Sequence, residues 1–155
     1  MTNVTRSVVI LEDDSNLMHE LENLFAKKLP DCSLTIFDAE DAIVAAIGKI
    51  AKNRPDLFIL DLFVRASSLR RKKSRLQVSP WFAGIRVAKL LRKEPSLQHV
   101  PIILTSYLNE ESIRSGMGST ILSQPQVSFV QKGNHSPANI MDAVQEVLQK
   151  IETPA

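Results

Sequence analysis

The chain has 155 residues, of which 44% are hydrophobic and 23% are charged, a composition typical of one globular domain with a substantial core. Its net charge of +2 does not favour a nucleic-acid-binding protein. The longest aliphatic stretches, residues 42–47 and 57–60, fall far short of the roughly 18 residues that span a bilayer, so no membrane insertion is expected. The first residues lack the apolar core of a secretory signal, and Cys32 is a lone cysteine that cannot form an internal disulfide. Both features predict a cytoplasmic location.

Five short apolar runs predict β-strands, because they are brief and rich in β-branched residues. In chain order they cover residues 8–11, 34–37, 57–60, 102–104 and 127–130. Apolar residues at helical spacing predict amphipathic helices over residues 17–25, 43–50, 84–93 and 140–151, with a further short helix after Asn109. Asp14 is expected to cap the first helix, and Ser136 is expected to cap the last one with Pro137 at its first position.

The alternation of strands and helices predicts an α/β fold, a doubly wound five-stranded parallel sheet with helices on both faces. Thr35 and Ser128 interrupt the second and fifth runs, so these strands are expected at the edges, which fits the strand order 2-1-3-4-5. We expect a single domain with a core of about residues 7–151 and a long basic insertion at about residues 62–83.

Polar residues follow the apolar strands at the ends that such a fold brings together. Glu12 and Asp13 follow the first strand, Asp61 the third, Thr105 the fourth and Lys132 the fifth. Three carboxylates placed together repel one another unless a cation offsets their charge, and hard oxygen ligands suit Mg²⁺. The lysine can balance added negative charge and the hydroxyl can donate to a phosphoryl oxygen, so the pattern indicates phosphoryl chemistry on a carboxylate.

The segments VVILEDD, PDLFILDLF, PIILTS and FVQKG resemble the receiver domain of two-component response regulators, a flavodoxin-like fold. The resemblance implies that Asp61 is the phosphoacceptor and that its donor is a phosphohistidine on a sensor histidine kinase or a histidine phosphotransfer protein. It also implies that Glu12, Asp13, Asp61 and the backbone carbonyl of Phe63 hold Mg²⁺.

The same resemblance implies a switch. Thr105 would bind the phosphoryl group and move toward it, Phe129 would turn inward in response, and Lys132 would pair with the phosphate. The change would alter binding to a downstream protein that the sequence does not identify. Such a domain catalyses only its own phosphorylation and dephosphorylation. Since few residues follow the last predicted helix, a stand-alone receiver without an output domain is expected.

The connection after Asp61 departs from the family pattern. Arg65 stands where a proline is usual, and the matching Gly84 comes 23 residues after Asp61, which is much later than in the family. The connection carries a basic run that is a candidate partner-binding segment: Arg70, Arg71, Lys72, Lys73 and Arg75. A solvated loop, docking to an acidic protein surface and, least favoured, nucleic-acid binding all remain open.

Two alternative functions were compared with the receiver. A pseudo-receiver, which binds partners without phosphorylation, would be expected to lack a key residue, and none is missing from the motifs. A haloacid-dehalogenase-like phosphatase needs a second acid two residues after its nucleophile, where this chain has Phe63. Its acidic pair would also come last in the chain, whereas Glu12 and Asp13 come first.

Overall fold

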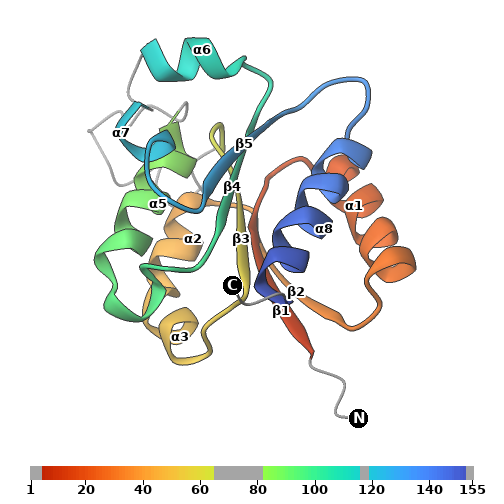
Figure 1. Ribbon diagram of the computed structural model, residues 1–155, viewed down its shortest axis with the longest axis horizontal. Coiled ribbons are helices and arrows are strands. Elements are labelled where there is room, and N and C mark those ends of the chain that lie inside the picture. Colours follow the sequence, from red (N-terminus) through yellow and green to blue (C-terminus); the bar gives the residue numbers. More distant parts are fainter. Residues whose placement is uncertain (1–4, 65–81, 116–118, 153–155) are drawn as a thin grey trace.

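The computed structural model describes residues 5–64, 82–115 and 119–152, which form a five-stranded parallel sheet between two layers of helices (Figure 1). The sheet order is β2-β1-β3-β4-β5, and every neighbouring pair is parallel. The predicted α/β fold and strand order are therefore confirmed. The strands are β1 (Arg6–Leu11), β2 (Cys32–Phe37), β3 (Leu57–Asp61), β4 (Ile102–Ser106) and β5 (Val127–Gln131).

The helices divide between the two faces of the sheet. Helices α1 and α8 pack on one face, and α2, α3, α5 and α7 contribute to the core on the other. The helical elements are α1 (Ser15–Lys28), α2 (Glu40–Ala45), α3 (Ile47–Lys52), α5 (Ala83–Lys93), the 3-10 turn Pro95–Leu97, α6 (Glu110–Ile113), α7 (Ser119–Leu122) and α8 (Ala138–Glu152). Within the described ranges, none of these helices is long and apolar enough to cross a membrane.

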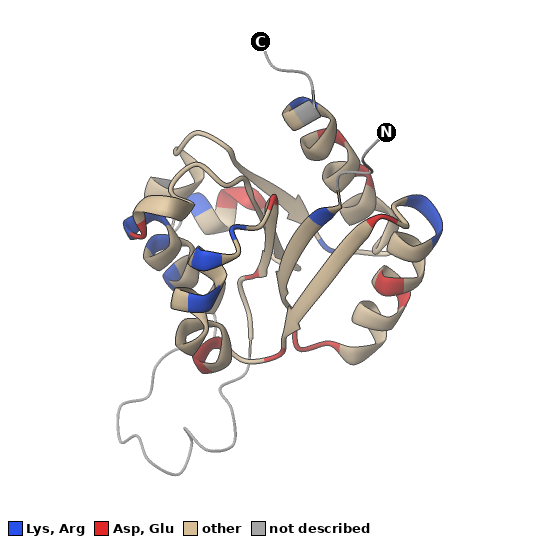
Figure 2. Cartoon of the chain, turned by 90° about the horizontal axis from the view of Figure 1, so that it is seen from below, with Lys and Arg blue, Asp and Glu red and all other residues tan. Residues whose placement is uncertain are grey.

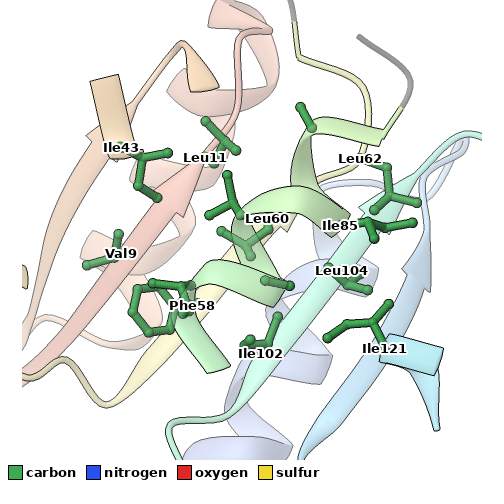
Figure 3. Close-up of a cluster of buried hydrophobic side chains, with 14 of the residues drawn as sticks. Val9, Leu11, Ile43, Phe58, Leu60, Leu62, Ile85, Ile102, Leu104 and Ile121 are labelled. Atoms are coloured by element: carbon green, nitrogen blue, oxygen red, sulfur yellow. The ribbon is translucent and has the colours of Figure 1, made fainter. Parts of the chain in front are cut away.

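Burial follows the position of each strand in the sheet. Every residue of β3 and β4 is buried, because helices cover both faces of these inner strands. Successive side chains enter opposite core clusters, with Phe58 and Leu60 on the α5 side (Figure 3) and Leu57 and Ile59 on the α1 side. Strands β2 and β5 have no fully buried residue, so the prediction that they are the edges is confirmed.

Two predicted helix features are wrong. The helix expected over residues 43–50 is divided at Ala46, whose N–H donates to the carbonyl of Ile43, three residues back, and thereby ends α2. Ser136 does not cap α8, which begins at Ala138, because the Ser136 hydroxyl accepts from the Gly133 N–H and donates to the Asn139 side chain. The Asp14 cap of α1 is confirmed, since its carboxylate accepts from the N–H groups of residues 16 and 17.

The long connection between β3 and α5 is described only at its two ends. Leu62 and Val64 are buried after β3, and Phe82 packs against the same core before α5 begins. The candidate partner-binding run lies outside the described residues, as does Arg65: Arg70, Arg71, Lys72, Lys73 and Arg75. Its role stays a prediction.

Gly84 fixes how closely α5 approaches the end of β3. A Cβ at this position would lie 2.5 Å from the carbonyl oxygen of Asp61 and 3.1 Å from Cα of Leu62, both of them backbone atoms. The Gly84 N–H also donates to the Leu62 carbonyl at 3.4 Å. Only glycine permits this contact, so the first turn of α5 rests directly on the backbone that carries Asp61.

We expect Gly84→Ala to lower the free energy of unfolding by about 1–3 kcal/mol, because a methyl group would push rigid backbone segments apart. The matched control is Gly48→Ala in α3, where an added Cβ meets nothing within 4 Å. That change should stabilise the protein by about 0.5–1 kcal/mol through helix propensity. Urea unfolding of both variants measures these free energies. Equal changes in the two variants would show that the packing of α5 does not depend on the close contact of Gly84 with the Asp61 backbone.

Candidate functional site

The carboxyl ends of the parallel strands bring the predicted site residues to one edge of the sheet. Glu12 directly follows β1, Asp61 ends β3 and Lys132 directly follows β5. Thr105 on β4 lies opposite Asp61 in the parallel register. Lateral hydrogen bonds continue beyond the strand ends, since the N–H groups of Glu12 and Lys132 donate to carbonyls of the neighbouring chain segments at 3.0 and 2.7 Å. The backbone of the site is therefore fixed by the sheet itself.

Three carboxylates converge at this edge. Oxygen atoms of Glu12, Asp13 and Asp61 all lie within 4.8 Å of one another, with Glu12 and Asp61 buried and Asp13 half-buried. Figure 2 shows acidic segments, in red, close together at the strand ends. The buried ammonium of Lys132 contacts the carboxylates of Glu12 at 2.5 Å and Asp61 at 2.9 Å. Among the described residues, Lys132 is therefore the cation that pairs with both buried carboxylates of the cluster.

The pKa of Asp61 reflects its burial and its charged neighbours. Burial, followed by repulsion from Glu12, raises the pKa of Asp61 to about 7, although the attraction of Lys132 acts in the opposite direction. Burial also disfavours the charged form of Lys132, but the carboxylates of Asp61 and Glu12 outweigh it and raise the pKa of the ammonium. Lys132 therefore stays charged, and Asp61 is the group whose ionisation an additional cation would favour.

Local backbone contacts orient two of the carboxylates. The N–H of Asp14 donates to Glu12 Oε1 at 3.1 Å, and the N–H of Phe63 donates to Asp61 Oδ1 at 3.2 Å. An all-oxygen set that is partly open to solvent matches the preference of hard divalent cations such as Mg²⁺. The three carboxylates therefore fit a divalent metal site, and Phe63 lines the same cleft as Asp61. The role of the Phe63 carbonyl as a ligand stays a prediction.

The site opens into a cleft of about 580 Å³. Its described lining consists of Glu12, Asp13, Asp14, Ser15, Asp38, Asp61, Phe63, Ser106, Tyr107, Leu108 and Lys132. The Lys132 Nζ atom lies 5.2 Å from the centre of the Tyr107 ring, a cation–π distance, although the tyrosine is 65% exposed. Tyr107 therefore covers the lysine from the solvent side.

Two expected switch residues are not part of this lining. Thr105 is buried beside Asp61 at 1% exposure, and Phe129 is half-buried against the core on the α5 side of the sheet. Their roles stay predictions. Sequence reasoning missed Asp38 and Ser106. Asp38 directly follows the predicted strand over residues 34–37, and that position was the available indication; Ser106 ends β4, which extends two residues beyond the predicted strand over residues 102–104. The Ser106 hydroxyl accepts from the Leu108 N–H at 3.1 Å and so shapes the rim beside Tyr107.

Several solved structures share this fold. The phosphorylated cyanobacterial phytochrome response regulator RcpA has a TM-score of 0.68 and 16% identity, over 98% of this chain and 97% of that one. The Mn²⁺-bound response regulator Rcp1 has a TM-score of 0.60 and 18% identity, over 94% of this chain and 91% of that one. The receiver domain of sensor histidine kinase PA1611 from Pseudomonas aeruginosa, with magnesium in its active-site cleft, has a TM-score of 0.63 and 12% identity, over 94% and 99% of the two chains.

Neither a scan against protein-family models nor a comparison with curated proteins gives a match. The sheet order and the helix layers define a doubly wound, flavodoxin-like α/β domain. Within that class, the chain has the fold of response regulator receiver domains, as its likeness to these structures over nearly their whole length shows.

In the metal-free protein, Asp61→Asn should raise the free energy of unfolding at pH 8 by about 2–4 kcal/mol. The folded pKa of Asp61, about 7, lies above its ordinary value of 3.8, so the folded state favours the protonated carboxyl. That stabilisation is present below about pH 4 and is lost as the pH rises through 7, whereas asparagine does not ionise. The free energy of unfolding of the variant should therefore exceed that of the wild type by more at pH 8 than at pH 5.

Urea unfolding in the presence of a chelator measures this difference. Added Mg²⁺ should stabilise the wild type at pH 8 and leave the asparagine variant nearly unchanged, since the variant has lost one of the three carboxylates. If the difference in unfolding free energy between the variant and the wild type is the same at pH 5 and pH 8, the assignment of the raised pKa to Asp61 is contradicted.

Proposed function

We propose that this chain is a phosphorylation-operated receiver, in which Mg²⁺-dependent transfer of a phosphoryl group to Asp61 switches binding to a downstream protein. The observation that carries the proposal is the convergence of three carboxylates and a buried lysine at the strand ends. The neighbours in the structure comparison support it, because one is a phosphorylated response regulator and another is a receiver domain with magnesium in its cleft.

The donor in this proposal is a phosphohistidine on a sensor histidine kinase or a histidine phosphotransfer protein. A carboxylate oxygen of Asp61 attacks the phosphorus in line, a P–O bond forms as the P–N bond breaks, and the departing imidazole takes a proton from solvent. Glu12, Asp13, Asp61 and the Phe63 carbonyl would hold Mg²⁺, which when bound would neutralise charge on the phosphoryl oxygens. Lys132, already held between Glu12 and Asp61, supplies a fixed positive charge beside them.

Two other functions are less well supported. A pseudo-receiver would use the same fold for partner binding alone, but it gives no reason for three carboxylates that converge beside a buried lysine. A phosphatase of the haloacid-dehalogenase type would need a general acid two residues beyond Asp61. Phe63 stands there and lines the cleft, so no carboxyl group is available at that position.

Phosphorylation of Asp61 is tested with acetyl phosphate and Mg²⁺, which should add one phosphoryl group to the wild type, detected by intact-protein mass spectrometry. Asp61→Asn should not be labelled. Asp13→Ala should lose the dependence on Mg²⁺ together with most of the labelling, because affinity for a hard cation depends on the number of carboxylates.

The matched control for this labelling is Asp56→Asn. Asp56 lies at the other end of β3, where its carboxylate accepts from the Ser7 N–H. This variant should be labelled like the wild type. Labelling of Asp61→Asn to the same extent as the wild type would exclude Asp61 as the acceptor and leave the pseudo-receiver as the better account.

The lifetime of the phosphoryl group should depend on two aromatic side chains. Phe63 and Tyr107 both line the cleft, and we expect them to limit the approach of water to the phosphoryl group. Phe63→Asn and Tyr107→Asn should each shorten the half-life severalfold, measured as the decay of the phosphorylated mass after removal of acetyl phosphate. Tyr107→Phe keeps the ring and should leave the half-life unchanged. A half-life unaltered in both asparagine variants would show that the rings do not shield the site.

A further inference from the structure

Glu40 and Arg86 join the two helices that begin beside the cleft. Glu40 is the first residue of α2, and Arg86 lies in the first part of α5, which runs next to α2 in Figure 1. The Arg86 Nε and Nη2 atoms donate to the two carboxylate oxygens of Glu40, both at 2.7 Å. The two side chains are only 10% and 29% exposed, so this is a two-pronged, charge-assisted contact that is largely shielded from solvent.

Glu40 lies two residues after Asp38, and Arg86 lies two residues after Gly84. On the α2 side, Asp38 lines the cleft, and the preceding carbonyl of Phe37 accepts from the Glu12 N–H at 3.0 Å. On the α5 side, Gly84 rests on the Asp61 carbonyl and donates to Leu62. The ion pair therefore connects the segment that holds Glu12 to the segment that holds Asp61. Neither Glu40 nor Arg86 is among the described residues that line the cleft.

The connection before α5 is long, and its length bears on the role of the ion pair between Glu40 and Arg86. Residues 62–82 separate Asp61 from the first residue of α5, whereas a short loop would position the helix by its own geometry. In the described part of the chain, the first turn of α5 contacts the backbone of residues 61 and 62 through Gly84, and α2 through Arg86. These noncovalent contacts position the first turn of α5 against Asp61.

We propose that Glu40 and Arg86 are positioning residues: their ion pair holds the first turn of α5 against the backbone of residues 61–63 and thereby sets the affinity of the cleft for Mg²⁺. The metal part of this inference rests on the proposed function. The positioning of the backbone does not rest on it, because Leu62, Phe63 and Gly84 donate their hydrogen bonds to Thr105, Asp61 and Leu62 of the chain itself.

The test compares Arg86→Gln with Arg92→Gln, a matched change on the same helix. Arg92 donates to the carbonyls of Leu97 and Val100, at the end of α5 that lies away from the cleft. Both variants should lower the thermal midpoint. Only Arg86→Gln should accelerate amide hydrogen exchange at Leu62, Phe63 and Gly84 in the metal-free protein and weaken Mg²⁺ binding, measured by calorimetry, on the order of tenfold.

Two further variants make the result specific. Arg86→Lys keeps the charge but cannot form the bidentate contact, so it should give an intermediate loss of Mg²⁺ affinity. It replaces Arg86→Gln in the test if that variant fails to fold. Glu40→Gln should weaken Mg²⁺ binding and accelerate amide exchange as much as Arg86→Gln does. The double variant should bind Mg²⁺ no more weakly than either single variant, because both changes remove the same contact.

The inference is overturned if Arg86→Gln leaves exchange and Mg²⁺ affinity unchanged. It is also overturned if Arg92→Gln weakens Mg²⁺ binding to the same extent for the same loss of stability, since the pair would then act only on overall stability. A wild type that binds no Mg²⁺ would refute the proposed function instead, and the exchange of the three amides would still decide whether the pair positions the backbone.

Discussion

The repulsion among buried carboxylates at the strand ends is the constraint on which this account depends. In the part of the chain that the structure describes, Glu12 and Asp61 share the buried cation Lys132, and Asp13 places a third carboxylate at their side. Burial alone would favour neutral carboxyls, and the raised pKa of Asp61 reflects that cost. A fold keeps such an arrangement only when other contacts stabilise the backbone around it, and a divalent cation would offset the repulsion among the carboxylates.

The sheet supplies that stabilisation. The inner strands β1, β3 and β4 are anchored in core clusters on both faces, and hydrogen bonds to Glu12, Leu62 and Lys132 extend the ladder past the last strand residues. Gly84 then brings α5 onto the carbonyl of Asp61 at a distance that no other residue type permits. Main-chain hydrogen bonds and core packing therefore fix the backbone positions that carry the charged groups of the site.

Much of this could be predicted from the sequence, because strand burial and strand-end chemistry are local signals. Continuous apolar runs identified the inner strands, Thr35 and Ser128 marked the edges, and parallel topology placed Glu12, Asp61 and Lys132 together. The division of the α2–α3 region at Ala46 could not be predicted, since the apolar spacing continues through it. The contact of Tyr107 with Lys132 and the ion pair of Glu40 with Arg86 depend on tertiary packing, which no spacing along the chain encodes.

The central claim is that Asp61 accepts a phosphoryl group in a metal-dependent site, and a structure with beryllium fluoride and Mg²⁺ tests it most directly. Beryllium fluoride mimics a phosphoryl group on a carboxylate without transferring one. We expect it to bind an oxygen of Asp61, the metal to contact Glu12, Asp13 and the Phe63 carbonyl directly or through water, and Lys132 to pair with the fluorides. Binding to another residue, or no binding at saturating Mg²⁺, would contradict the central claim.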